Sequence, residues 1–139
     1  MLRILLAYGI AALVMLALDV VWLTTMVGML YAPIMGDLMR PKPDMVAAVA
    51  FYVLYIFGLV WLVIRPALVH GVRWGSVAMA SGLFGLVAYG TYDLTAQAVI
   101  VGWSWKLTVI DMIWGTFLTM TTGLCTVFLL KVMGQAKSA

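Results

Sequence analysis

The sequence predicts an all-α polytopic membrane protein, a bundle of four transmembrane helices forming a single domain over residues 1–139. Hydrophobic residues make up 66% of the chain and charged residues only 9%, and the mean hydropathy is +1.16. Soluble domains carry about 25% charged residues, so this chain has too few charges to cover a water-facing surface. The composition excludes a water-soluble enzyme domain and a disordered chain, and nucleic acid is not an expected partner.

Four apolar runs each have the roughly 20 residues that a helix needs to cross a bilayer. The predicted helices cover residues 4–30, 45–64, 77–100 and 107–130. The start of the first run resembles a signal peptide, with Arg3 before an apolar stretch. However, the apolar pattern continues past Asp19 and no small-x-small cleavage site follows, so we expect this run to remain as a helix.

Prolines and polar residues predict where the helices end. Residues 31–44 contain three prolines and are expected to interrupt the helical course, with at most a short turn on the membrane surface. Asp44 is placed to cap the second helix, and Pro66 predicts that this helix ends one residue earlier. Trp103 and Trp105 in the last connection suit a lipid–water interface.

The distribution of lysine and arginine predicts the orientation. Five of these residues fall at the two termini and in the second connection: Arg3, Arg65, Arg73, Lys131 and Lys137. Three fall in the first and third connections: Arg40, Lys42 and Lys106. Cytoplasmic segments carry the excess of positive charge, so both termini are expected in the cytoplasm.

Three aspartates lie inside the predicted spans and are the most informative residues of the chain. Asp19 lies late in the first apolar run, Asp93 late in the third and Asp111 about one turn into the fourth. A charge at the centre of a bilayer costs about 2.5–3.5 kcal/mol on insertion scales. With a rise of about 1.5 Å per residue, all three fall in the outer half of the membrane. We expect them to face inward and to lie close together.

The neighbours of these aspartates strengthen the prediction of a polar cluster. Asp19 and Asp111 are each followed by tryptophan at the third position, so that each acid shares a helical face with an indole N–H donor. On the third helix a polar stripe at a spacing of four contains Asp93, with a tyrosine beside it. The candidate ligand-binding or proton-binding residues are Asp19, Trp22, Tyr89, Tyr92, Asp93, Gln97, Asp111 and Trp114.

The fourth predicted helix also carries a face of small and polar residues suited to close helix packing. The members of this face are Asp111, Gly115, Thr119, Thr122 and Thr126. This pattern favours a structural alternative for the acids, in which they hydrogen-bond across helices and fix the packing.

Other chemistry is absent from the sequence. His70 stands alone, without the cysteine or carboxylate neighbours of a metal site. No glycine-rich phosphate loop, HExxH motif or Gly-x-Ser-x-Gly motif is present. We predict no catalytic residue and no metal ligand, do not expect an enzyme, and leave any cofactor unknown.

Several strings resemble a family of small bacterial four-helix membrane proteins called domain of unknown function 2177. They are Tyr55-Ile-Phe, Arg65-Pro-Ala-Leu, Gly82-Leu-Phe-Gly85, Thr91-Tyr-Asp-Leu-Thr95 and Asp111-Met-Ile-Trp-Gly115. The family pattern continues with asparagine where this chain has Ala96. The resemblance implies a multi-pass protein of the bacterial inner membrane and adds no mechanism.

Three hypotheses for the function remain. The first is a membrane protein that binds a small or lipid-like ligand at the outer-leaflet Asp/Tyr/Trp cluster. The second is a small oligomeric, proton-coupled transporter in which Asp19 or Asp93 exchanges a proton for substrate. The third is a structural subunit of a larger membrane complex. The lipid bilayer is the expected surrounding in each case, and a homo-oligomer or a larger complex is compatible with the polar helix faces.

Overall fold

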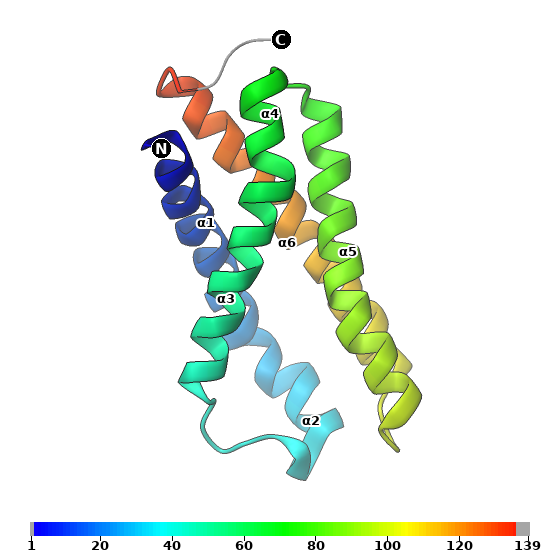
Figure 1. Ribbon diagram of the computed structural model, residues 1–139. Coiled ribbons are helices and arrows are strands. Elements are labelled where there is room, and N and C mark those ends of the chain that lie inside the picture. Colours follow the sequence, from blue (N-terminus) through cyan, green and yellow to red (C-terminus); the bar gives the residue numbers. More distant parts are fainter. Residues whose placement is uncertain (1, 136–139) are drawn as a thin grey trace.

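The computed structural model describes residues 2–135 and shows a bundle of four helical rods (Figure 1). The first rod runs through α1 (Leu2–Met26), the π turn η1 (Val27–Tyr31), α2 (Ala32–Met35) and the 3-10 turn η2 (Gly36–Leu38). The second runs through α3 (Met45–Leu59), the π turn η3 (Val60–Ile64) and α4 (Arg65–His70). The third and fourth are α5 (Trp74–Val99) and α6 (Trp105–Val132).

The predicted all-α membrane architecture is confirmed. Three rods are long and apolar enough to cross a membrane, namely Leu2–Leu38, Met45–His70 and Trp105–Val132. α5 has 26 residues, also a spanning length, but the tyrosines, threonines, aspartate and glutamine of its second half make it less apolar. The crossing of the membrane by α5 stays a prediction.

Two predicted helix ends are wrong, and both lie at prolines. The helical course continues through Pro33 to Leu38 and through Pro66 to His70. Each proline is the second residue of an α segment that follows directly on a π turn. A π turn precedes each of these segments, and its wider geometry moves the carbonyl with which the proline ring would otherwise clash.

The cap of the second rod is confirmed. The Oδ1 atom of Asp44 accepts hydrogen bonds from the backbone N–H groups of Val46 at 3.0 Å and Ala47 at 3.2 Å. These N–H groups have no partner within the helix, so the carboxylate stabilises the first turn of α3. Arg40 forms a surface ion pair with the same carboxylate, at 3.5 Å.

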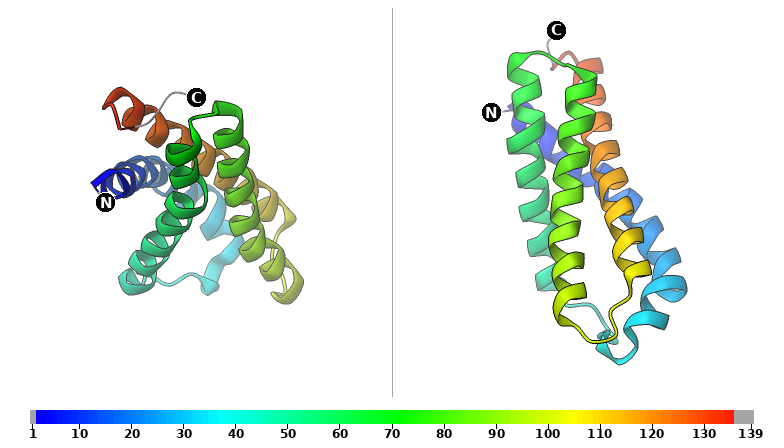
Figure 2. Two further views of the ribbon diagram at one scale, coloured as in Figure 1. Left: turned by 45° about the horizontal axis from the view of Figure 1, so that its top comes forward. Right: turned by 90° about the vertical axis from the view of Figure 1, so that its right-hand side faces the viewer.

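Successive rods run in opposite directions, so that each end of the bundle holds a different set of turns and chain ends. The N-terminal end of α1, the turn between α4 and α5 and the end of α6 lie together, whereas α2 and the α5–α6 turn lie at the opposite end (Figure 1). α5 and α6 form the most extensive helix pair, side by side in Figure 2, and α1 packs against α6. The second rod approaches α1, α5 and α6 through its π turn, Val60–Ile64.

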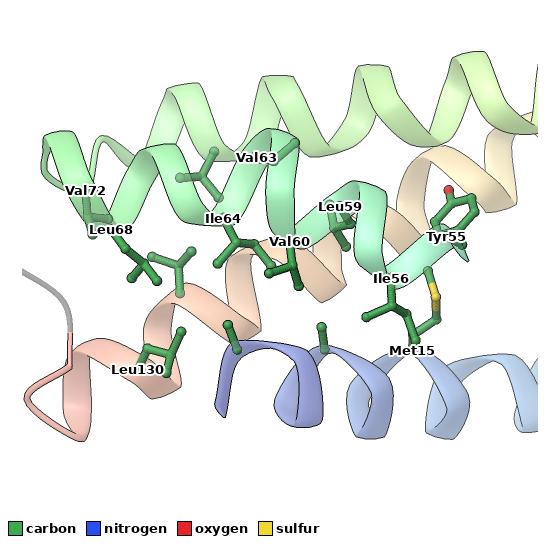
Figure 3. Packing of buried hydrophobic residues seen from close by; sticks show 14 of the residues in the cluster. Met15, Tyr55, Ile56, Leu59, Val60, Val63, Ile64, Leu68, Val72 and Leu130 are labelled. Carbon is green, nitrogen blue, oxygen red and sulfur yellow. The ribbon is translucent and has the colours of Figure 1, made fainter. Parts of the chain in front are cut away.

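Two apolar clusters divide the interior along the bundle axis. The larger one joins residues such as Met15 of α1, Tyr55 and Ile64 of the second rod and Leu130 of α6 (Figure 3). The smaller one, toward the α5–α6 turn, has as its buried members Leu30, Ala96, Trp103 and Leu107. The first rod, α5 and α6 contribute to both clusters. On each of them, the intramembrane aspartate lies in the sequence between the residues of the larger cluster and those of the smaller one. The acids therefore form a polar layer between two apolar layers.

Small residues allow α5 and α6 to approach closely. A Cβ atom on Gly85 of α5 would overlap the carbonyl oxygen of Gly115 and lie 2.5 Å from Oγ1 of Thr119. The small, polar face predicted on α6 is buried at Asp111, Gly115 and each of its threonines. This packing brings α5 against the helix that carries Asp111.

Candidate functional site

The three intramembrane aspartates all point into the bundle. Asp19 is 6% exposed, Asp93 is fully buried and Asp111 is 5% exposed. None of the three faces the lipid, as the depth argument predicted. Asp19 and Asp111 lie in one cluster, because Asp19 accepts a hydrogen bond from Trp114, about one turn after Asp111 on α6. That Asp93 lies close to both stays a prediction.

The hydrogen bonds of two aspartates cross between α1 and α6. The indole Nε1 of Trp114 donates to Oδ1 of Asp19 at 3.2 Å. The indole Nε1 of Trp22 donates to the hydroxyl of Tyr31 at 3.0 Å, and this hydroxyl donates to Oδ1 of Asp111. The two indoles stack face to face, with centroids 4.2 Å apart and planes 6° apart. The indole of Trp114 thus bonds the acid of α1 directly, whereas the indole of Trp22 reaches Asp111 only through the hydroxyl of Tyr31, in its own rod.

Tyrosines of α3 complete the cluster from the other side. The hydroxyl of Tyr52 donates to Oδ2 of Asp19 at 2.5 Å, so both oxygens of this carboxyl group have a donor. The hydroxyls of Tyr55 and Thr119 lie 2.7 Å apart and hydrogen-bond across α3 and α6. These bonds fix the position of α3 beside the polar layer.

Asp93 differs from the other two acids. Neither of its oxygens has a hydrogen-bond partner among the residues that the structure describes, although the side chain is completely buried. A buried polar group without a partner costs about 1–3 kcal/mol, and more when it is charged. Such groups are rare in native proteins and point to a strain reservoir, a functional role or an additional binding partner.

Gln97 joins a separate network at the end of α5. Its Nε2 donates to the carbonyl of Trp103 at 3.2 Å, and its Oε1 accepts from the hydroxyl of Thr108 at 3.1 Å. The indole of Trp103 donates to the same hydroxyl at 3.1 Å, so this network ties the α5–α6 turn to both helices. Trp103 is only 8% exposed and packs inside the bundle at this turn, whereas Trp105 is 64% exposed. The position of both at the lipid–water interface stays a prediction.

A cavity of about 180 Å³ opens between α3 and α5 at the level of the acids. Its lining consists of Phe51 and Tyr55 of α3, Ala88, Tyr89 and Tyr92 of α5, and Asp111 of α6. Tyr89 packs so closely on Gly115 that any side chain there would overlap its ring. The cavity therefore combines aromatic walls with one buried carboxyl group.

The predicted site residues thus separate into three groups. Tyr89, Tyr92 and Asp111 line the cavity. Asp19, Trp22 and Trp114 belong to the crossed hydrogen-bond network beside it. Asp93 is buried without a partner, and Gln97 is bonded into the turn network. That these residues bind a ligand or a proton stays a prediction.

Four residues of the cluster are absent from the predicted candidates: Tyr31, Phe51, Tyr52 and Tyr55. The nearby prolines predict a connection at Tyr31, yet this residue is helical and bonds Asp111. Phe51 lies in an unbroken apolar run, where no sequence feature distinguishes a residue that lines a cavity from one that faces lipid. The partners of Tyr52 and Tyr55 follow only from the packing of α3.

The side chains at the cavity are of kinds that can bind a ligand. Within residues 2–135 no group of histidine, cysteine and acidic side chains has the arrangement of a metal site. The side chains at the cavity supply a carboxyl group, phenol hydroxyls and ring faces. Such a set suits a polar head group held by hydrogen bonds, by charge and by contact with aromatic rings.

Replacing Trp114 by phenylalanine is expected to lower the stability of the protein by about 1–3 kcal/mol, because Oδ1 of the buried Asp19 loses its donor. The ring that stacks on Trp22 is retained, so the change isolates the hydrogen bond. Thermal unfolding in a non-ionic detergent measures the effect. The control is Trp105→Phe on the same helix, whose side chain is 64% exposed. Equal unfolding temperatures for the two variants would show that the bond contributes nothing.

The comparison with known proteins identifies one family. The model of the DUF2177 family, described as a predicted membrane protein, matches residues 4–128. No curated protein and no solved structure matches the chain at a significant level. The matched range includes all the residues of the polar layer and of the cavity.

Proposed function

The chain belongs to the DUF2177 family of predicted membrane proteins, and we propose that it binds a small, lipid-like ligand at its Asp/Tyr/Trp cluster. The observation that carries the proposal is the cavity between α3 and α5, which Asp111 lines, together with the fully buried and unpartnered carboxyl group of Asp93, the residue that follows the lining residue Tyr92. A ligand with a hydrogen-bond donor or a positive charge would supply what this group lacks.

The setting of the cavity favours a ligand that is itself embedded in the bilayer. Phe51, which is 46% exposed, and Tyr92, which is 55% exposed, form the outer edges of its walls. In a membrane this surface faces lipid, so a molecule could place its polar head at Asp111 while its apolar part stays among the acyl chains. A ligand could therefore enter the cavity from the bilayer, between α3 and α5, without first passing through water.

The proposed location is the bacterial inner membrane, with both termini in the cytoplasm. Arg3, Arg65, Arg73 and Lys131 lie at one end of the bundle, and Arg40, Lys42 and Lys106 lie at the other. The larger number at the end that holds the termini supports this orientation. The cavity then opens to the outer leaflet.

Native mass spectrometry of gently extracted protein tests the proposal. We expect the wild type to carry a reproducible additional mass, and Asp93→Asn to lose it or to retain it at least tenfold more weakly. Asp37→Asn, at an exposed position of η2, is the matched control and should keep the mass.

The same measurement examines the alternatives. A bare monomer in the wild type, or a mass that Asp93→Asn leaves unchanged, contradicts ligand binding at this site and leaves the aspartates as packing groups. A stable complex with other proteins and without a small molecule would favour a structural subunit. A bound substrate whose uptake into proteoliposomes requires a pH gradient would favour a transporter.

A further inference from the structure

The charges inside the bundle are unbalanced. Asp19, Asp93 and Asp111 are buried, yet the lysine, arginine and histidine side chains of residues 2–135 all lie toward the two ends of the bundle. Within the same residues the sole ion pair is between Arg40 and Asp44, at the surface. Buried carboxylates are normally paired with a cation or with several donors. This interior provides donors to two of its acids and a cation to none of them.

The acids nearest the cavity are the ones with unused acceptors. Asp19 has a donor at each oxygen, from Tyr52 and Trp114. Asp111 receives a bond from Tyr31 at Oδ1, and its side chain lines the cavity. Asp93 receives none, and it directly follows Tyr92, a lining residue of the cavity. The unmet need for positive charge is therefore concentrated beside the cavity.

The walls of the cavity are aromatic. Phe51, Tyr55, Tyr89 and Tyr92 line the cavity together with Asp111, and the ring of Tyr55 meets that of Tyr89 edge to face, with centroids 6.4 Å apart. The faces of aromatic rings attract cations within about 6 Å of their centroids, and aromatic cages bind quaternary ammonium groups in this way. An anionic head group would meet the carboxyl group of Asp111 and no cation.

We propose that the cavity binds the ammonium group of an organic cation, with Asp93 and Asp111 supplying the opposite charge and the tyrosine and phenylalanine rings surrounding it. This inference rests on the proposed function and names the class of ligand. The ammonium group could belong to the head of a membrane lipid or to a free amine from the aqueous phase. The chemistry of recognition is the same for both.

Titration calorimetry of the protein in a non-ionic detergent tests this inference with three probes. Choline carries the ammonium group without a tail, and dodecyltrimethylammonium carries it with an acyl-like tail. The third probe, 3,3-dimethyl-1-butanol, has the shape of choline with a carbon atom in place of the charged nitrogen. We expect an ammonium probe to bind at least tenfold more tightly than the uncharged one.

Two variants and one control locate the binding. Asp111→Asn should weaken the binding of the ammonium probes at least tenfold, and Asp37→Asn should not change it. Tyr92→Leu removes one ring at a side chain that is 55% exposed, so it reports on the cage even where Asp111→Asn fails to fold, and it should weaken binding severalfold. Much tighter binding of the tailed probe than of choline points to a lipid source, and equal binding points to a free amine.

Equal binding of choline and its uncharged analogue would overturn the inference, and so would the absence of binding by both ammonium probes. Neither result removes the proposed function if native mass spectrometry still shows a bound mass that depends on Asp93. If that mass is also absent, the site itself is refuted. The two failures are therefore distinguishable.

Discussion

Replacing Gly85 by alanine should destabilise the bundle by about 1–3 kcal/mol, the usual cost of forcing extra atoms into a packed interface. The added Cβ would overlap the carbonyl oxygen of Gly115 and lie 2.5 Å from Oγ1 of Thr119. The first of these atoms belongs to the backbone of α6, so the overlap can be relieved only by moving the two helices apart. That movement would also disturb the wall of the cavity, because Tyr89 packs on Gly115.

The matched control for this substitution is Gly75→Ala, also in α5. A Cβ atom at Gly75 meets nothing within 4 Å. Alanine is favoured over glycine in a helix by about 1 kcal/mol, so the control should be neutral or slightly more stable. Thermal unfolding in a non-ionic detergent compares the two variants with the wild type. If Gly85→Ala unfolds at or above the temperature of Gly75→Ala, the close packing of α5 on α6 described here is incorrect.

The architecture was accessible from the sequence because lipid imposes a simple rule. A helix must be apolar over about 20 residues to cross the bilayer. Such a run is continuous in the sequence, so it can be recognised without knowledge of tertiary contacts. The depth of Asp19, Asp93 and Asp111 follows from the same counting, since each helix rises by about 1.5 Å per residue. Their burial could therefore be predicted before any contact was known.

The helix ends were less accessible. A proline in an apolar run indicates a break, but Pro33 and Pro66 each follow a π turn that lets the helical course continue. The residues around these π turns carry no sequence pattern from which the turns could be predicted. The role of Tyr31 was missed for this reason, although it bonds Asp111 directly.

The partners within the cluster also depend on tertiary packing. The Asp-x-x-Trp repeats correctly place an acid and an indole on one face of α1 and of α6, but spacing within one helix cannot tell which acid an indole bonds. The packing of α1 on α6 decides this: the indole of Trp114 bonds Asp19 on the opposite helix, and the indole of Trp22 bonds Tyr31 in its own rod. The cavity likewise depends on how far α3 stands from α5, which the sequence does not record.

Filling the cavity is expected to abolish ligand binding while leaving every acid of the cluster in place. Ala88 of α5 lines the cavity of about 180 Å³, so the ring of Ala88→Phe can occupy that space without displacing a carboxyl group. Added packing in an existing cavity should keep the unfolding temperature at or above that of the wild type. Loss of the ligand with retained stability would show that the cavity binds it independently of the packing of the bundle. Substitution of an aspartate cannot show this, because it changes the packing and the binding site together.

The control is Ala98→Phe, at an exposed position of the same helix, where the added ring meets no part of the cavity. The deciding measurement is the fraction of protein that carries bound ligand in native mass spectra of the two variants and the wild type. A binding site between α3 and α5 predicts that Ala98→Phe matches the wild type and that Ala88→Phe carries no ligand. Equal occupancy in Ala88→Phe and the wild type would show that the ligand does not bind in this cavity.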